Sequence, residues 1–232
     1  MLHSTKDLVG YGVGATDGAI GHVKDVYFDD GMWVVRYLVV DAGNWLSSRK
    51  VLISPIEIGD PDRKRRLLPA SLTRQQVRNS PDVDTEKPVS RQHEFEYTAY
   101  YGYPDYWGDK DPHLRSCNAV MGYGIHASDG DIGHVQDMLV DDQTWAVRYL
   151  IVDTGNWWLG HKVLIAPQWI EYVSWYDGKF SVKLTRQVVK DAPEYDPLAI
   201  LTRMQEVRLH EHYGRGGYWS RGEERDIEAL RL

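Results

Sequence analysis

Two arginines stand where a charged side chain needs a specific reason. Arg36 lies within the run WVVRYLVVD (33–41), and Arg148 lies within the similar run WAVRYLIVD (145–153). Burying a guanidinium among apolar residues is costly unless an acid pairs with it. An inter-strand ion pair is therefore expected, and the preceding segments supply the acids: Asp25 or Asp29 for Arg36, and Asp137 or Asp141 for Arg148.

Contact with a partner protein is the alternative role for these arginines. Arginine together with aromatic residues is typical of interaction hot spots. Tryptophans are frequent near both runs, and a small domain cannot bury all of them. The candidate interaction residues are Arg36, Arg148, Trp33, Trp45, Trp145, Trp157 and Trp158.

Acidic turns suggest a second kind of chemistry. Asp17, Asp25, Asp29 and Asp30, with His22 and the equivalent residues of the second copy, could ligate a hard cation. Aspartates beside glycine usually cap turns with their own side chains, however, and one histidine per copy is too few for a zinc site. We expect structural turns and no bound metal or cofactor, and a cation-responsive or small-ligand sensor remains the alternative function.

No pattern indicates a catalytic site. The single cysteine, Cys117, has no activating base beside it in sequence. Because the chain has only one cysteine, a framework of internal disulfides is excluded. Gly10 to Gly14 only loosely imitates a dinucleotide fingerprint, because a turn and a strand follow instead of a helix. His210 and His212 flank an acid and are expected to be solvated. The protein is not expected to be an enzyme.

The chain contains two copies of one sequence unit. Adding 112 to a residue number in 11–58 gives its counterpart in 123–170, and 28 of these 48 positions are identical without a gap. The register continues through 72–84 and 184–196. Solenoid repeats run roughly 20–50 residues, so this longer repeat indicates a duplicated domain.

Each copy is predicted to be mainly β with short helices. Segments 20–30, 33–41 and 50–55 are rich in β-branched and aromatic residues and are bounded by turn dipeptides. In the second copy, 169–176 and 179–184 flank Asp177-Gly178, which favours a tight hairpin. Short strands at this spacing favour a small closed or nearly closed barrel.

Helices are predicted after the strands of each copy. Thr73 with Gln76, and Thr202 with Gln205, have the spacing of a capping box. A Tyr-rich helix is expected at 91–102. The aromatic residues of these tails should pack on the barrels or on another chain.

Charge and hydropathy exclude several classes of function. Residues 1–112 carry 14 basic against 17 acidic residues, and residues 113–232 carry 13 against 17. An even acidic excess argues against nucleic-acid binding, which needs a basic face. No apolar run approaches 18 residues, so membrane insertion is not expected. We expect a cytoplasmic protein. This expectation is compatible with docking on a membrane protein complex.

The repeated motifs resemble the PRC-barrel family. Both DGAIGHVKDVYFDDGMWVVRYLVVDAGNW and DGDIGHVQDMLVDDQTWAVRYLIVDTGNW, each followed by VLI-x-P, carry the resemblance. The family is named for the cytoplasmic domain of the photosynthetic reaction-centre H subunit and is similar to the C-terminal domain of a ribosome maturation factor. The resemblance implies a small β-barrel used as a non-catalytic adaptor, with a protein partner or a homo-oligomer.

The expected organisation has four segments. They are a first PRC-like barrel at 1–84, a Tyr-rich helical tail and linker at 85–112, a second PRC-like barrel at 113–196 and a helical C-terminal tail at 197–232.

Overall fold

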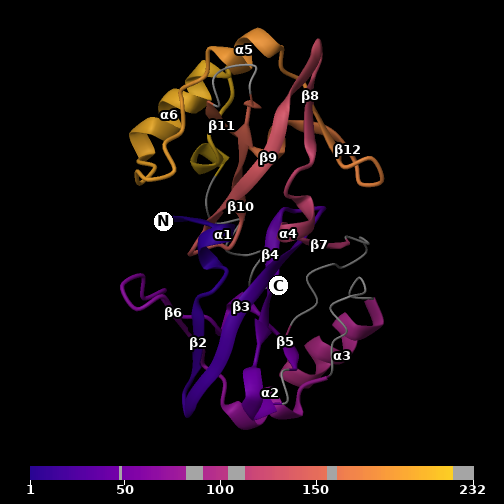
Figure 1. The fold of residues 1–232 in the computed structure, drawn as a ribbon, viewed down its shortest axis with the longest axis vertical. Helices are drawn as coiled ribbons and strands as arrows, with labels where there is room; N and C mark the ends of the chain where they lie inside the picture. The colour runs from indigo at the N-terminus through magenta and orange to yellow at the C-terminus, as the bar shows by residue number, and fades with distance from the viewer. Residues whose placement is uncertain (47–48, 82–90, 104–112, 156–160, 222–232) are drawn as a thin grey trace. The chain divides into compact units, whose positions relative to one another are not determined.

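A computed structural model describes residues 1–46, 49–81, 91–103, 113–155 and 161–221. The chain forms two compact units, each containing most of one sequence copy. Of the described residues, the first-copy unit takes 5–118 and 142–146, and the second-copy unit takes 1–4, 119–141 and 147–221. The prediction of a mainly β fold with short helices is confirmed, because each unit contains one sheet (Figure 1).

The first-copy sheet has the strand order β5-β4-β3-β2-β6, and β7 pairs with β3. Neighbours are antiparallel except β2 and β6, which are parallel. The strands are β2 (Gly12–Ala15), β3 (Gly18–Asp29), β4 (Val34–Asp41), β5 (Lys50–Ile53), β6 (Leu67–Pro69) and β7 (Leu114–Ser116). The helical segments are α1 (Thr5–Leu8), η1 (Gly43–Leu46), η2 (Pro55–Glu57), α2 (Arg74–Asn79) and α3 (Arg91–Tyr101).

The second-copy sheet repeats this order as β11-β10-β9-β8-β13-β12, and β1 pairs with β9. Its strands are β1 (Leu2–Ser4), β8 (Gly124–Ala127), β9 (Gly130–Asp141), β10 (Val147–Asp153), β11 (Lys162–Ile165), β12 (Ile170–Ser174) and β13 (Lys179–Val182). The helical segments of this half of the chain are α4 (Cys117–Val120), η4 (Pro167–Trp169), α5 (Arg186–Lys190), α6 (Arg203–His212) and η5 (Tyr218–Arg221).

The core of each unit is a long antiparallel hairpin, β3–β4 or β9–β10. Residues Val34 to Val40 are all buried, which agrees with a strand covered on both faces. The hairpin tolerates no side chain at Gly21, because a Cβ there would collide with the backbone of Asp41. Gly133 meets the same constraint at Asp153. Close backbone approach therefore explains the Ile-Gly pair that both copies keep.

The predicted caps and hairpin are confirmed. Thr73 with Gln76 forms a reciprocal capping box on α2, and Thr202 with Gln205 forms another on α6. Strands β12 and β13 are the antiparallel hairpin expected around Asp177-Gly178. No helix among the described residues is long and apolar enough to span a membrane.

The barrels expected from strand spacing are open in this structure. Within the described residues, β11 and β12 are the two end strands of the second-copy sheet, and no ladder pairs them to close a barrel. In each copy a 3-10 turn beginning at a proline, Pro55 or Pro167, follows the end strand. Because proline cannot donate to a ladder, the chain leaves the sheet at that point.

The two copies exchange their first strands. The sequence did not predict this exchange. β1 begins the first copy, yet it pairs with β9 in the second-copy unit. β7 is its counterpart 112 residues later and pairs with β3 in the first-copy unit. Equivalent serines fasten both strands: Ser4 donates to the Asp137 carboxylate, and Ser116 Oγ donates to Asp25 Oδ2 at 2.5 Å.

The exchange predicts which unit each serine stabilises. Ser4→Ala should weaken amide protection in β9, because the Asp137 carboxylate loses a hydrogen bond of a kind that contributes about 1.5–3 kcal/mol. Ser116→Ala is the matched control and should weaken β3 instead. Hydrogen exchange resolved by peptide tests this, and loss of β3 protection in Ser4→Ala would contradict the exchange.

Candidate functional site: buried charges and a pocket beside helix α6

Arg36 is paired inside the first-copy unit. Its Nε lies 2.8 Å from Asp29 Oδ2, and the two side chains are 6% and 0% exposed. The other oxygen of Asp29 accepts a hydrogen bond of 2.6 Å from the Met32 backbone. Of the two acids that the sequence offered, Asp29 is therefore the partner, and Asp25 serves the exchanged strand β7. Burial raises the pKa of the Asp25 carboxyl.

Arg148 occupies the equivalent position with different neighbours. Its Nε lies 3.8 Å from Asp141 Oδ2, beyond hydrogen-bonding distance, and its guanidinium lies 4.0 Å above the Tyr218 ring. A cation over an aromatic face gains about 0.5–2 kcal/mol, depending on desolvation. The second copy thus stabilises the same buried charge partly with an aromatic ring from η5.

The three candidate tryptophans that the structure describes pack against other residues of the fold. Trp45 donates a hydrogen bond of 2.6 Å to the Ile20 carbonyl, and Arg74 stacks over its ring at 4.2 Å. Trp33 stacks on Phe28 at 5.1 Å, and Trp145 is 5% exposed. Both Trp33 and Trp145 have the left-handed backbone that is rare for such residues, with φ of 59° and 55°. Trp157 and Trp158 lie outside the described residues.

The acidic turns use their carboxylates on the backbone. Asp17 and Asp129 each accept the amide of the first residue of a helix, Arg74 and Arg186, at 2.7 Å. Asp41 likewise accepts the Gly43 amide at 2.9 Å. In the part of the chain that the structure describes, no group of three or more His, Cys, Asp or Glu residues is arranged to hold a metal ion.

Helix α6 carries a buried polar network that was not predicted from the sequence. Glu206 and His210 are 4% and 2% exposed, so the expectation that His210 is solvated was wrong. The Tyr149 hydroxyl lies 3.0 Å from Glu206 Oε1 and 2.9 Å from His210 Nε2, and it has one proton for the two acceptors. Tyr218 donates a second hydrogen bond to Glu206 Oε1 at 2.8 Å.

The protonation of His210 follows from its surroundings. Its Nδ1 lies 3.0 Å from the Gly216 carbonyl, which can only accept, so Nδ1 carries a proton. Burial, with the nearby positive charge of Arg203, holds the pKa of the imidazole below its usual value. The rings of Trp169 and Trp219 enclose it at 5.1 and 4.9 Å. The neutral imidazole anchors α6 to the sheet.

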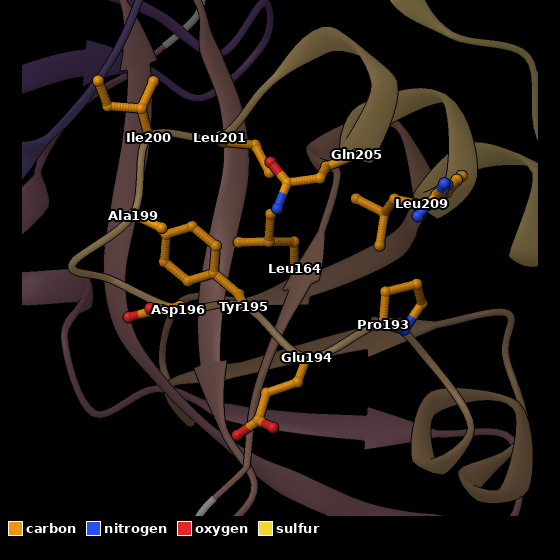
Figure 2. Close-up of a pocket in the computed structure, with 11 residues that line it drawn as sticks. Leu164, Pro193, Glu194, Tyr195, Asp196, Ala199, Ile200, Leu201, Gln205 and Leu209 are labelled. Atoms are coloured by element: carbon orange, nitrogen blue, oxygen red, sulfur yellow. The ribbon is translucent and has the colours of Figure 1, made fainter.

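The other face of α6 borders a pocket of about 210 Å³. Leu164 of β11, Leu209 of α6 and the Tyr195 ring enclose its apolar interior, as Figure 2 shows. Gln205 and Arg208 of α6 add polar groups to its wall. The remaining wall is the segment that connects α5 with α6: Pro193, Glu194, Asp196, Ala199, Ile200 and Leu201.

The internal repeat held a signal for the buried network. Tyr37 and Glu94 of the first copy correspond to Tyr149 and Glu206, and Glu94 is also buried at 3% exposure. Three positions of this helix are identical in the two copies, Arg91/Arg203, Glu94/Glu206 and Tyr101/Tyr213, and the shared glutamate could have been marked from them as functional or structural. No comparable signal marks the pocket, because most of its lining comes from α6 and the segment before it, where the copies largely differ; Leu164 and Pro193 are exceptions that match Leu52 and Pro81.

The Arg36–Asp29 pair should dominate the stability of its unit. Arg36→Met should cost about 3–5 kcal/mol of unfolding free energy, because a fully buried carboxylate would lose its partner. Adding Asp29→Asn, which keeps an oxygen for the Met32 amide, should restore much of the loss. Denaturant unfolding of the single and double variants measures the coupling.

Arg148→Met is the matched control, and its cost should be smaller because Asp141 is 15% exposed and keeps some hydration. Additive effects of Arg36→Met and Asp29→Asn would contradict the pairing.

His210 should make the protein less stable as the pH falls. Its folded-state pKa lies below the usual 6.5, so below about pH 6.5 the unfolded chain binds more protons and stability is lost. His210→Thr, which introduces the residue at the equivalent position 98, should flatten this part of the profile. Urea midpoints measured between about pH 7.5 and pH 5.5 test it. The exposed His134, changed to Thr, is the control, and a profile unchanged by His210→Thr would refute the assignment.

Comparison with known proteins agrees with the repeated motifs. The family model of the PRC-barrel domain matches residues 3–71. An uncharacterised protein of Deinococcus radiodurans is 36% identical over 77 residues, which are 32% of this chain and 27% of that protein. The chain thus spans about a quarter of the length of this relative. The segment matched by the family model covers β1 to β6 with their connections and is similar in sequence to a PRC-barrel domain.

Proposed function

We propose that the protein is a non-catalytic adaptor that binds a segment of a partner protein beside helix α6. The observation that carries this proposal is the pocket next to an apolar rim. Leu198, Ile200 and Met204 are 96%, 62% and 65% exposed, although each is a large hydrophobic residue. Such residues grouped around a pocket are typical of protein interaction sites.

The chemistry of the pocket supports binding over catalysis. Among the described residues, its wall contains no serine, threonine, cysteine or histidine, so it offers no hydroxyl or thiol nucleophile of the kind that a histidine base activates. Its polar groups are Glu194, Asp196, Gln205 and Arg208. Polar groups at the margin of an apolar interior orient a bound segment and give it specificity.

The net charge of the chain favours a partner that is not acidic. A second hollow on the Glu194–Asp196 segment is lined by both carboxylates, Tyr195, Pro197 and Lys162. With Arg208 of the pocket wall the local charges balance, whereas the whole chain carries a net charge of −7. Complementary charge raises the rate of association and disfavours wrong partners.

Site-specific photo-cross-linking tests the proposal. A photoreactive residue at position 204 of the full chain, produced in its native host, should give one adduct of defined mass. The same residue at position 172, which is 64% exposed on β12, is the control and should not give that adduct. Leu198→Asp with Ile200→Asp should abolish it, because both charges would lie in the apolar rim. Identical adducts from positions 204 and 172 would refute the site, and an adduct of twice the chain mass would identify a homo-oligomer instead.

A further inference from the structure

The two copies differ at a helix residue that lines the pocket in the second copy. In the register of 112 residues, Leu209 corresponds to Tyr97, Leu164 to Leu52 and Pro193 to Pro81. The end strand and the proline are the same in both copies. The helix contributes a tyrosine in one and a leucine in the other.

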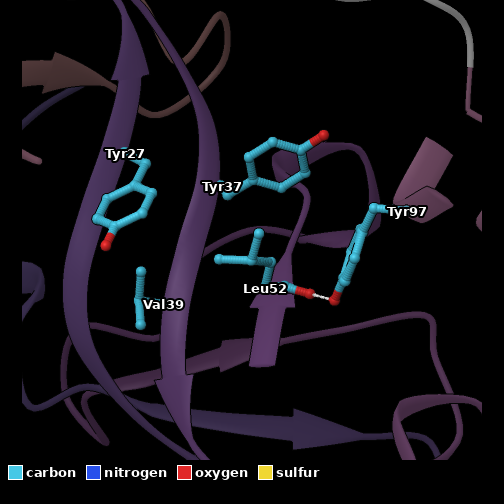
Figure 3. Close-up of a cluster of buried hydrophobic side chains, with 5 residues drawn as sticks. All are labelled: Tyr27, Tyr37, Val39, Leu52 and Tyr97. Atoms are coloured by element: carbon cyan, nitrogen blue, oxygen red, sulfur yellow. Dashed lines mark hydrogen bonds between the residues drawn. The ribbon is translucent and has the colours of Figure 1, made fainter. Parts of the chain in front are cut away.

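In the first-copy unit the ring of Tyr97 fills the space beside the end strand. It is 1% exposed and packs with Tyr37, Val39 and Leu52, as Figure 3 shows. Its hydroxyl donates a hydrogen bond to the Leu52 carbonyl. Among the described residues, β5 has a ladder only with β4, so alternate carbonyls on its other side need a partner from elsewhere. Tyr97 supplies that partner.

In the second-copy unit the same space is the pocket. Leu209 is shorter than tyrosine and has no hydroxyl, and it lines the pocket together with Leu164. The Lys162 carbonyl points away from β10, because it accepts the Tyr195 amide at 2.8 Å. Carbonyls two residues apart on a strand point to the same side, so the Leu164 carbonyl faces the pocket side. Among the described residues, no side chain is found donating to it.

We infer that the pocket binds the side chain of a tyrosine from the partner protein. The ring takes the place that Tyr97 fills in the first-copy unit, and the hydroxyl donates to the Leu164 carbonyl. This inference rests on the proposed function and names the group that the partner inserts. A hydroxyl is needed because a phenyl ring would bury the carbonyl without giving it a hydrogen bond.

The surroundings favour a tyrosine of a protein over a free phenol. A free phenol would occupy only the pocket and would leave Leu198, Ile200 and Met204 exposed. A tyrosine within a polypeptide brings flanking residues that cover this rim. Tyrosine is also enriched at interfaces, since it combines a large apolar ring with one polar atom.

The test uses p-cresol, which is the tyrosine side chain itself, and toluene, which lacks the hydroxyl. Each is titrated into the isotope-labelled full chain while the methyl resonances of Leu164, Ile200 and Leu209 are followed. We expect p-cresol to shift these resonances at millimolar concentration and toluene to bind about tenfold more weakly. Equal affinities would overturn the hydrogen bond to Leu164.

Leu209→Tyr should fill the pocket from within and abolish the shifts caused by p-cresol. Leu198→Tyr is the matched control, because it adds the same ring at the exposed rim and should leave p-cresol binding intact. The comparison of p-cresol with toluene needs only the wild-type chain, so the inference stays testable if Leu209→Tyr does not fold.

The cross-linking experiment separates this inference from the proposed function. If the partner inserts a tyrosine, Leu209→Tyr should reduce the adduct at position 204 at least about tenfold, because the space is no longer open. An undiminished adduct together with p-cresol binding would mean that the pocket takes free phenols and not the partner. An adduct without any p-cresol binding would overturn the inference and leave the adaptor proposal standing.

Discussion

The long antiparallel hairpin of each copy, β3–β4 or β9–β10, is the element on which the rest of the structure depends. The exchanged strand pairs with β3 or β9, and the end strand pairs with β4 or β10. In the second copy α6 is held to β10 through Tyr149. Strands β4 and β10 are buried along almost their whole length, and a slip of one residue in register would move every side chain to the opposite face. The positions of the exchanged strand, the end strand and the helix are therefore fixed by one ladder.

The buried arginine in this hairpin acts within the fold and not at a surface. Desolvating a guanidinium is costly, and the structure offsets that cost in two ways. Asp29 holds Arg36 with a charged hydrogen bond between two buried side chains. Arg148 pairs with Asp141 at a longer distance, and the ring of Tyr218 covers its guanidinium. The two copies thus stabilise the same charge with an acid in one case and with an acid and an aromatic ring in the other.

The differences between the copies are the reason why we propose the interaction site in the second one. Thr98 hydrogen-bonds within its own helix, whereas His210 at the same position joins α6 to β10 and to the Gly216 loop. Tyr97 closes the end strand that Leu209 leaves open beside a pocket. After a duplication, one copy can keep a filled core while the other leaves the same space open. The tyrosine proposed for the open space has its counterpart in the first copy only as Tyr97 beside Leu52.

The sequence by itself determined the duplication, the mainly β fold and the local elements. Strands, capping boxes and the hairpin at Asp177-Gly178 follow from neighbouring residues, because periodicity, caps and turns are set by contacts within a few positions. It also identified the arginines as buried and offered Asp29 among two candidate acids. Local pattern could not choose between Asp25 and Asp29, since both alternatives lie on the same strand.

Only the tertiary structure decided the strand exchange, the burial of His210 and the pocket. A three-residue strand carries no mark of the sheet that it joins, so Leu2–Ser4 gave no sign that it pairs with β9. His210 stands next to the acidic Glu211 in sequence, and its burial depends on Tyr149 and Trp169 from distant parts of the chain and on Trp219 of η5. The pocket depends on an end strand, a helix and their connection meeting in space. Such features arise from contacts between residues far apart in sequence, which no local pattern records.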